Sequence, residues 1–309
     1  MSLKTPLLFL IFNRPDTTVQ VLEAIRRIKP QHLYIAQDGP REDHPGEAEL
    51  VSNIRNEVLS SIDWDCNVQT LFREKNLGCK LAVSSAITWF FKNEEMGIIL
   101  EDDCIPSQSF FLFCEKMLIK YKDDTRIWLI SGHNPISSNH SGDSYFFSHY
   151  PVVWGWASWK RCWDKYDSNH ICDSQLKIII DDFFSNRIFS KIWIETLIKV
   201  KEGIINTWDF DLVLTIIINN GMIIKPHKNL VINIGFGETA THTKSANSTL
   251  KALPLQDIDV ENLKDPVYIY RDLYEDLLYS EYRSKVNIIT KCQCFIEIFK
   301  NKCQIFEKN

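Results

Sequence analysis

Residues 97–104 read Gly97-Ile98-Ile99-Leu100-Glu101-Asp102-Asp103-Cys104, an apolar run that stops at three consecutive carboxylates. An isoleucine-rich run of this length predicts a buried strand. Three adjacent like charges at its end are costly unless a cation or hydrogen-bond donors meet them. Mg²⁺ or Mn²⁺ fits best, because hard divalent cations take carboxylate oxygens and share their coordination with substrate phosphates. A solvated acidic turn is the alternative interpretation.

Strand-like and helix-like segments alternate on both sides of this run. Such alternation predicts an α/β fold with a parallel sheet covered by helices. We expect the first helix to start with Asp16 as its N-cap. The expected strands are 6–12, 32–36, 68–72, 97–100 and 127–130, and the expected helices are 16–28, 47–59, 81–91 and 107–121.

Polar segments follow the first four of these strands. They are Asn13-Arg14, Gln37-Asp38-Gly39, Asn76-Leu77-Gly78 and Glu101-Asp102-Asp103. Each segment alone is explained by turn chemistry. In a doubly wound sheet, however, ligands bind at the carboxyl ends of the strands, near the point where strand order reverses. Four polar segments at one edge therefore favour a ligand site.

Aromatic residues dominate the next part of the chain, from Tyr145 to Trp163. Most are expected in the core, although a tryptophan at a cleft suits stacking on a sugar ring. Gly155 between two tryptophans predicts close approach of the backbone to another group. Further on, we expect helices at 175–184 and 188–201, then an apolar helix that ends at Gly221 as its C-cap, and strands at 222–225 and 230–234.

Composition narrows the class of protein. The chain has 309 residues, of which 45% are hydrophobic and 24% charged, as in soluble globular enzymes. A formal net charge of -5 gives no electrostatic footprint for nucleic acid, so we expect no nucleic-acid partner. The apolar segment 1–12 is expected to be a strand rather than a signal peptide. Nine scattered cysteines then indicate reduced thiols and a cytoplasmic location.

The order of several motifs points to a family. Together with Pro6 to Arg14, Gln37-Asp38-Gly39 and Glu101-Asp102-Asp103, the chain carries Trp128 to Asn134, Trp154-Gly155-Trp156 and Trp208-Asp209. Over roughly residues 5–245 it resembles the GT-A nucleotide-sugar glycosyltransferases, in particular the N-acetylglucosaminyltransferase I-like family with its bacterial hemolysin HlpA-like relatives. The resemblance implies a GT-A, Rossmann-like mixed sheet with helices on both faces.

Residue roles follow from the resemblance. It implies that Arg14 contacts the nucleotide diphosphate and that Asp38 hydrogen-bonds uracil. The Glu-Asp-Asp triplet corresponds to the family's D-x-D signature. In that signature Asp103 would coordinate the metal, while Glu101 and Asp102 would reach the sugar and the ribose.

The catalytic base is the next role that the resemblance implies. An aspartate beside a tryptophan at the start of a late helix matches Asp209, with Asp211 as its rival. Ser84 stands where the family has a histidine in its nucleotide pocket, so this chain departs from the family pattern at that position. The loop 235–243 resembles the bacterial branch, and its His242 is a second candidate for a metal or phosphate ligand. The full set of donor-binding candidates is Phe12, Asn13, Arg14, Asp38, Asn76, Ser84, Asp102, Asp103, Trp154 and Trp208, with Asp209 and Glu101 as catalytic candidates.

The implied reaction is inverting, metal-dependent transfer of a sugar from a nucleotide sugar, with UDP as the implied nucleotide, to a hydroxyl of a surface glycan or glycolipid. Such chemistry needs a cation for the diphosphate and a base for the attacking hydroxyl, and one base opposite the leaving group inverts the anomeric carbon. We expect a catalytic domain over 1–245 and a helical extension over 246–309 that packs on it. Peripheral contact of this tail with the inner face of the cytoplasmic membrane is the alternative.

Three other functions share individual features with this sequence. A sugar-1-phosphate nucleotidyltransferase shares the layered sheet and a metal-binding aspartate, but it needs a glycine-rich loop where this chain has Asn13-Arg14-Pro15-Asp16. A non-catalytic carbohydrate-binding module would retain the aromatic cleft and lose the carboxylates. The segment 235–240 fits G-x-G-x-x-A, but it does not follow the first strand, so a nicotinamide site is not expected.

Overall fold

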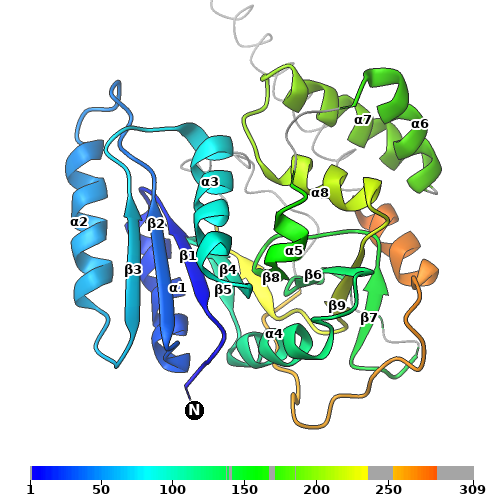
Figure 1. The fold of residues 1–309 in the computed structure, drawn as a ribbon, viewed down its shortest axis with the longest axis horizontal. Coiled ribbons are helices and arrows are strands. Elements are labelled where there is room, and N and C mark those ends of the chain that lie inside the picture. The colour runs from blue at the N-terminus through cyan, green and yellow to red at the C-terminus, as the bar shows by residue number, and fades with distance from the viewer. Residues whose placement is uncertain are drawn as a thin grey trace, which may run out of the picture.

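The computed structural model of the chain describes residues 2–136, 138, 141–166, 171–184, 186–235 and 253–283. Among these residues, eight strands form one mixed sheet with helices on both of its faces (Figure 1), as the α/β prediction requires. The strands of this sheet are β1 Leu7–Ile11, β2 His32–Gln37, β3 Asn67–Phe72, β4 Met96–Glu101, β6 Ile127–Ser131, β7 Tyr145–Ser148, β8 Trp156–Trp159 and β9 Met222–Pro226. The helices are α1 Pro15–Ile28, α2 Glu47–Ser60, α3 Gly78–Asn93, α4 Gln108–Lys120, α5 Lys160–Trp163, α6 Asp173–Phe183, α7 Arg187–Lys201 and α8 Asp209–Ile218.

The strand order is β3-β2-β1-β4-β8-β6-β9-β7. The first four strands are parallel to one another, and the chain crosses from β3 to the far side of β1 to add β4. This reversal between β1 and β4 is the switch point at which Rossmann-like sheets bind ligands. Strand β8 is antiparallel to both β4 and β6, which makes the sheet mixed.

The end of β4 is shaped by a feature that the sequence did not predict. After Asp102 and Asp103 the chain enters a short strand, β5 (Cys104–Pro106), which pairs antiparallel with β10 (Val231–Asn233). The backbone N–H of Ile234 also donates to the carbonyl of Asp103 at 2.8 Å. The two aspartates therefore lie in a tight turn that is tied to a segment about 130 residues later in the chain.

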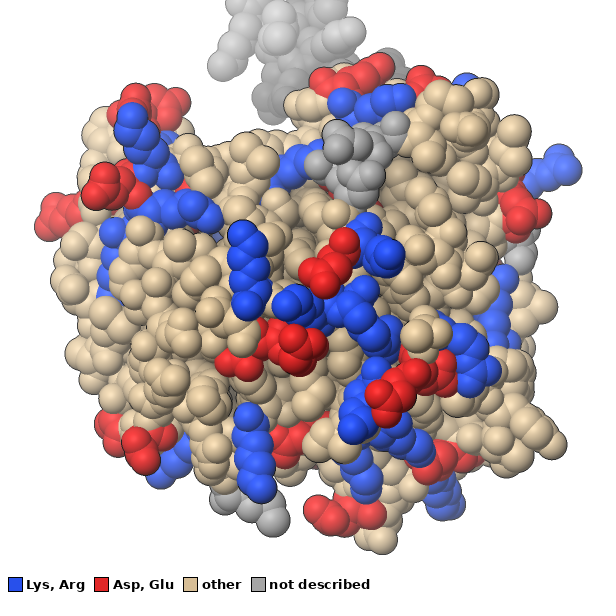
Figure 2. Space-filling view, in the orientation of Figure 1, with Lys and Arg blue, Asp and Glu red and all other residues tan. Residues whose placement is uncertain are grey.

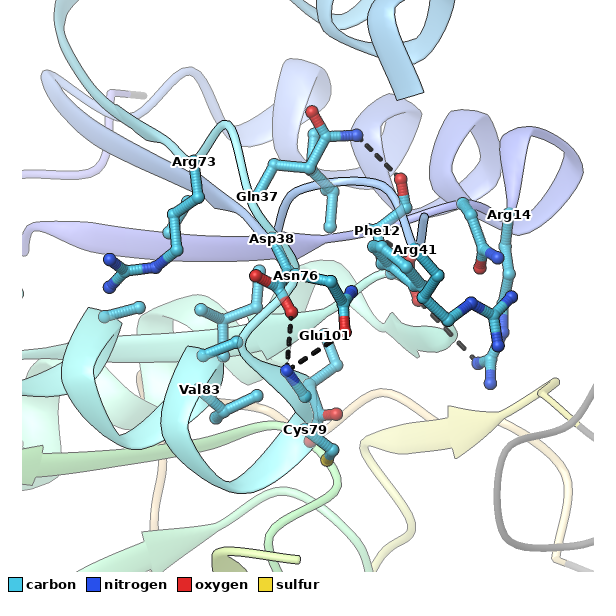
Figure 3. A pocket seen from close by; sticks show the side chains of 18 of the residues that line it. Phe12, Arg14, Gln37, Asp38, Arg41, Arg73, Asn76, Cys79, Val83 and Glu101 are labelled. Carbon is cyan, nitrogen blue, oxygen red and sulfur yellow. Dashed lines mark hydrogen bonds and ion pairs between the residues drawn. The ribbon is translucent and has the colours of Figure 1, made fainter. Parts of the chain in front are cut away.

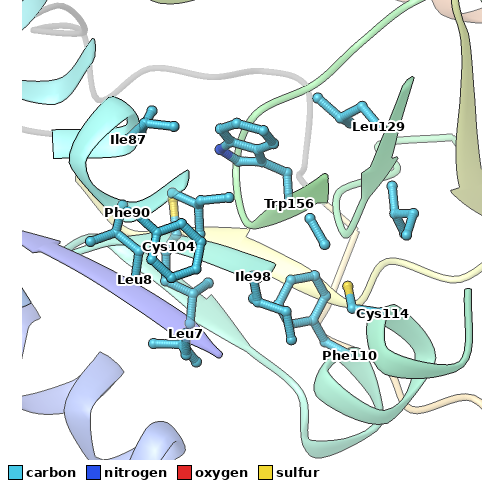
Figure 4. Close-up of a cluster of buried hydrophobic side chains, with 14 of the residues drawn as sticks. Leu7, Leu8, Ile87, Phe90, Ile98, Cys104, Phe110, Cys114, Leu129 and Trp156 are labelled. Carbon is cyan, nitrogen blue, oxygen red and sulfur yellow. The ribbon is translucent and has the colours of Figure 1, made fainter. Parts of the chain in front are cut away.

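The core lies between the sheet and its helices. Helix α1 contacts α2 and α4, whereas α3 contacts α5, so the two groups cover opposite faces. Figure 4 shows buried side chains on both faces of the sheet, with Phe90 of α3 near Leu8 of β1 and Phe110 of α4 near Ile98 of β4. All four side chains are almost fully buried. Burial of each contributes roughly 1.5–3 kcal/mol, so this cluster holds β1, β4 and the two helices together.

Helix α1 starts differently from the prediction. It begins at Pro15, its N-cap is Arg14, and no side chain caps it, so the expected Asp16 cap is wrong. Proline is well suited to the first helical position, because it lacks an N–H that would remain unpaired there. Asp16 instead lies in the first turn, where a carboxylate interacts favourably with the helix dipole. This register places the Arg14 side chain at the end of β1.

Helix α8 also ends differently from the prediction. Its left-handed residue is Asn220, with φ 52°, and not Gly221. The N–H of Gly221 donates to the carbonyl of Ile216 at 2.9 Å, which closes the helix end. Gly221 is needed for another reason, since a Cβ there would lie 2.6 Å from Cγ of Trp128. By contrast, the predicted close approach at Gly155 is confirmed, because a Cβ there would lie 2.7 Å from Val231.

The face shown in Figure 2 carries charges of both signs, and the thiols in the described ranges are free. Acidic and basic side chains are interspersed on the face shown in Figure 2. The cysteines in the described ranges, Cys66, Cys79, Cys104, Cys114, Cys162 and Cys172, are free, as expected for reduced thiols, although Cys172 is exposed. None of the helices described combines the length and the apolar character that a membrane span requires. His242 and the tail from residue 284 onward lie outside the described residues.

Residues 271–283 attach to the sheet through buried charges. Asp276 accepts hydrogen bonds from Ser148 and Arg271, both at 2.6 Å. Nearby, the ammonium of Lys225 in β9 lies 4.0 Å from the ring centroid of Tyr279. Burial lowers the pKa of Lys225 to about 8, although the charges of Asp276 and Glu275 oppose this shift. Lys225 therefore carries its charge at neutral pH at a cost to stability.

We predict that Gly221→Ala lowers the free energy of unfolding by about 1–3 kcal/mol, because the new methyl group overlaps Trp128. Asn220→Gly, its matched control, should change it by less than about 1 kcal/mol, since glycine accepts a positive φ. Urea denaturation of the two variants and the wild type measures both effects. Equal losses in the two variants would contradict this account of the helix end.

We also predict that stability rises with pH above 8 in the wild type relative to Lys225→Met. The native Lys225 loses its proton near pH 8, whereas the unfolded lysine retains it until near its ordinary pKa of 10.5. The unfolded state then binds more protons, so the free energy of unfolding increases with pH between these values, by up to about 3 kcal/mol. Urea denaturation at pH 7, 8, 9 and 10 measures the difference, and a constant difference would contradict the prediction.

Candidate functional site

A cavity of about 710 Å³ opens at the carboxyl ends of β1, β2 and β4. All four polar segments that the sequence singles out contribute to its wall (Figure 3). The size is in the range of small-molecule sites. The lining residues are Leu10, Ile11, Phe12, Asn13, Arg14, Ala36, Gln37, Asp38, Arg41, Leu50, Arg73, Asn76, Gly78, Cys79, Ala82, Val83, Ala86, Glu101, Asp102 and Asn206.

Arg14 joins the two strands at the switch point. Its Nη1 donates to Oδ2 of Asp103 at 2.6 Å and lies 3.8 Å from Oδ1 of Asp102. Asp102 also accepts from the backbone N–H of Phe12 at 2.9 Å, and Asn233 donates to the other oxygen of Asp103 at 3.1 Å. The start of α1 and the end of β4 are therefore tied together by charge and by hydrogen bonds.

The negative charge of the carboxylates at this edge is larger than the positive charge of the Arg14 guanidinium that pairs with them. Burial, followed by the charges of Asp103, Asp102 and Asp209, raises the pKa of Glu101 well above its usual range. Burial and the neighbouring Asp103 raise the pKa of Asp102 to about 7, against the opposing charge of Arg14. Mutual repulsion of this kind is relieved when a cation binds or when a carboxyl takes up a proton.

The donor set suits a hard divalent cation, because it consists of carboxylate oxygens. Across the described residues, however, no group of three or more His, Cys, Asp or Glu side chains converges as a metal site. Asp103 would therefore hold Mg²⁺ or Mn²⁺ only as one ligand among several. The others would come from substrate phosphates and water, which is the usual manner of Mg²⁺ binding.

The opposite wall of the cavity is held by Glu47 at the start of α2. It accepts from Asn13 at 2.8 Å and pairs with the guanidinium of Arg41. The hydrogen bonds from Arg41 lower the pKa of Glu47 to about 2, so this carboxylate stays charged. The guanidinium of Arg41 also lies 5.7 Å from the ring centroid of Phe12. Asn13 and Phe12 are thus positioned by α2 as well as by β1.

The two candidate bases differ in their surroundings. Asp211 is fully buried in the first turn of α8, and its Oδ2 pairs with the ammonium of Lys80 at 2.8 Å. Asp209 is partly exposed and accepts a hydrogen bond from the hydroxyl of Thr207. Burial, followed by the charges of Glu101 and Asp209, raises the pKa of Cys79 to about 12. The charge of Asp209 thus affects Glu101 as well as Cys79, although Asp209 is not among the residues that line the cavity.

Asn206 and Cys79 line the cavity, although the sequence analysis did not select them. Asn206 accepts from the backbone N–H of Lys80 at 2.8 Å, and its Nδ2 lies 2.8 Å from where a Cβ of Gly78 would be. It thereby connects the segment before α8 to the start of α3. No local pattern marks an isolated asparagine for this role. The Cys79 thiol stays protonated at its raised pKa, so it is not suited to act as a nucleophile.

The remaining predicted residues lie elsewhere. Trp208 is buried and stacks on Trp156 with ring centroids 5.8 Å apart, and Trp154 packs against His133 at 4.6 Å. Neither of the predicted tryptophans lines the cavity. Ser84 donates to the carbonyl of Lys80 at 2.6 Å, within α3. The roles of these three residues in donor binding stay predictions.

No protein-family model matches the chain, and no curated protein matches it. Similar solved structures include HddC from Yersinia pseudotuberculosis, with 11% identity, coverage of 54% of this chain and 82% of that chain, and a TM-score of 0.33. Another is 4-diphosphocytidyl-2C-methyl-D-erythritol synthase from Anaerococcus prevotii DSM 20548, with 12% identity, coverage of 57% and 84%, and a TM-score of 0.32. Likenesses of this size identify neither a family nor a function for this chain.

We predict that Lys80→Met lowers the free energy of unfolding by about 2–4 kcal/mol, because the buried Asp211 loses its cation. The double variant Lys80→Met with Asp211→Asn should recover part of this loss, since no buried charge is left without its partner. Thermal and urea denaturation of the single and double variants measures the coupling. Strictly additive effects would show that the pair contributes nothing to stability.

Proposed function

We propose that this protein is an enzyme that binds a nucleoside diphosphate sugar in the cavity at β1, β2 and β4 and transfers the sugar to a hydroxyl. The observation that carries the proposal is the pairing of Arg14 with Asp102 and Asp103, next to Glu101, at the switch point. The charge of Asp209 acts on the same cluster from α8. A cavity with an anion-binding guanidinium and several carboxylates suits a reaction at a pyrophosphate-linked centre.

Arg14 is assigned to the diphosphate. Its guanidinium lies at the carboxyl end of β1, beside the start of α1, and a guanidinium suits bidentate pairing with phosphate oxygens. A divalent cation on Asp103, when bound, would stabilise the charge that develops on the leaving diphosphate. Glu101 and Asp102, which line the cavity next to Asp103, are assigned to hydroxyls of the sugar and the ribose.

Asp209 is assigned as the base that takes the proton of the attacking hydroxyl. Asp211 is the less suitable of the two candidates, because its carboxylate is fully buried and paired with Lys80. A general base must reach the proton that it abstracts, and Asp209 is the partly exposed carboxylate. A single base opposite the leaving group favours inversion at the anomeric carbon.

The acceptor is assigned, on the family resemblance alone, to a hydroxyl of a surface glycan or glycolipid built at the inner face of the cytoplasmic membrane. The second candidate function is a sugar-1-phosphate nucleotidyltransferase, which would use the same cavity edge and a metal-binding aspartate. The turn after β1, Asn13-Arg14-Pro15-Asp16, lacks the glycine-rich loop that this second reaction needs. Its products also differ, since it releases or consumes pyrophosphate.

We predict that Asp209→Asn lowers turnover of the accepted nucleotide sugar by about 10²–10⁴-fold, because the base is lost. Binding of the nucleoside diphosphate should change little, as measured by isothermal titration calorimetry. Asp182→Asn, at an exposed position of helix α6, is the matched control and should leave both quantities unchanged. Release of nucleoside diphosphate from a panel of nucleotide sugars, with and without Mn²⁺, measures the activity.

Two outcomes would overturn these assignments. Full turnover by Asp209→Asn would remove Asp209 from the role of base. Metal-dependent formation of pyrophosphate from a nucleoside triphosphate and a sugar 1-phosphate, without release of nucleoside diphosphate from any donor, would favour the nucleotidyltransferase. Binding without either reaction would favour a non-catalytic module.

A further inference from the structure

The carboxylate of Asp38 has its acceptor positions occupied by backbone groups. The N–H of Gly39 donates to Oδ1 at 2.9 Å, that of Gly78 donates to Oδ2 at 3.1 Å, and that of Leu77 lies 3.0 Å from both oxygens. A carboxylate offers about four lone-pair sites, two on each oxygen. Each oxygen of Asp38 therefore already meets two N–H contacts, and a ligand N–H would have to displace one of them.

These contacts hold two loops together at the ends of β2 and β3. The loops approach so closely that a Cβ on Gly39 would lie 2.4–2.6 Å from backbone atoms of Lys75. Asn76 reinforces the contact, because its Nδ2 donates to the carbonyl of Gly39 at 2.8 Å and its Oδ1 accepts from Gly78 at 3.1 Å. Asp38 and Asn76 thus build the wall of the cavity. The acceptor sites of Asp38 are occupied, and Asn76 uses one of its two N–H donors and one of its two acceptor sites on the same contact.

Gln37, the third polar side chain of this region, is also occupied. Its Nε2 donates to the carbonyls of Phe12 at 2.6 Å and of Val51 at 3.3 Å. Its Oε1 accepts from Nε of Arg55 at 2.6 Å. The amide therefore connects β1, β2 and α2, and it is buried.

Arg73, at the end of β3, differs from these three. Its Nη2 donates to the hydroxyl of Ser85 at 2.7 Å, and in the described part of the chain this is the one hydrogen bond that its guanidinium donates. A guanidinium has five N–H donors. Figure 3 shows Arg73 and Arg14 at opposite ends of the cavity, with Asp38 and Asn76 between them. A nucleotide with its diphosphate at Arg14 would extend its base toward Arg73.

The donors of Arg73 suit one class of base. A guanidinium pairs in a bidentate manner with two adjacent acceptors. Guanine presents such a pair in O6 and N7, and cytosine presents one in O2 and N3. Uracil instead presents an N–H between two carbonyls, so a side chain that recognises it must accept a hydrogen bond from this N–H. The carboxylate of Asp38, in the same wall of the cavity, already accepts from backbone N–H groups.

We propose that Arg73 reads the nucleobase and favours cytosine or guanine over uracil, while Asp38 is a positioning residue that holds the two loops. This inference rests on the nucleotide site of the proposed function. It departs from the uridine that the family resemblance implies. The apolar side chains of Ala82, Val83 and Leu50 along the cavity supply surface for the face of the base.

The first test is calorimetric titration of the whole chain with CDP, GDP, UDP and ADP in excess Mg²⁺. We expect CDP or GDP to bind at least about tenfold more tightly than UDP and ADP, since a bidentate pair discriminates by this amount or more. Arg73→Met and Arg73→Lys should both abolish the preference, because lysine retains the charge and loses the fork. Arg187→Met, at an exposed arginine of α7, is the matched control and should keep it.

The second test is Asp38→Asn with the same four nucleotides. As a positioning residue, Asp38 should affect all of them by a similar factor, and thermal denaturation establishes that the variant is folded. Tightest binding of UDP by the wild type, with a shift toward CDP in Asp38→Asn, would overturn the inference and leave the nucleotide site standing. Equal affinities for the four bases would also overturn it. Failure of the wild type to bind any of the four would instead overturn the proposed function.

Discussion

The pairing of Arg14 with Asp103 is the interaction on which the site depends. The sheet reverses its order between β1 and β4, so the chain segments after these two strands face each other with no strand between them. Strand β4 ends in three carboxylates that repel one another, and the guanidinium at the end of β1 pairs with two of them and offsets part of this repulsion. Even with this guanidinium present, burial and then the neighbouring carboxylates keep the pKa values of Glu101 and Asp102 raised. The edge is therefore organised for further positive charge.

The sequence predicts the half of the fold in which local pattern and topology agree. From β1 to β4 each strand is joined to the next by a helix, and parallel strands joined by helices place their carboxyl ends at one edge. The four polar segments consequently line one cavity, as expected. Prediction of the cavity needed no knowledge of side-chain contacts, because strand direction alone collects these segments.

The remainder depends on contacts between distant residues, which leave little trace in local sequence. Strand β8 enters the sheet between β4 and β6, and β5 pairs with β10, but each is too short for its periodicity to stand out. Gly221 follows α8 where a C-cap glycine is expected, yet the structure uses Asn220 for the left-handed turn and Gly221 to make room for Trp128. Asn206, which precedes α8, likewise accepts a hydrogen bond from the start of α3, a segment distant in the sequence. A residue type is visible in the sequence, whereas its partner is not.

The same distinction governs the candidate site. The motif Gln37-Asp38-Gly39 correctly marks a polar segment at the end of β2, and a family resemblance gives its aspartate a ligand role. The hydrogen bonds show how the carboxylate is used: three backbone N–H groups from two loops converge on it. A side chain that is fully engaged in building a cavity wall cannot also be the main reader of what enters. The base must then be recognised by a side chain with unused N–H donors, and at this end of the cavity Arg73 has such donors.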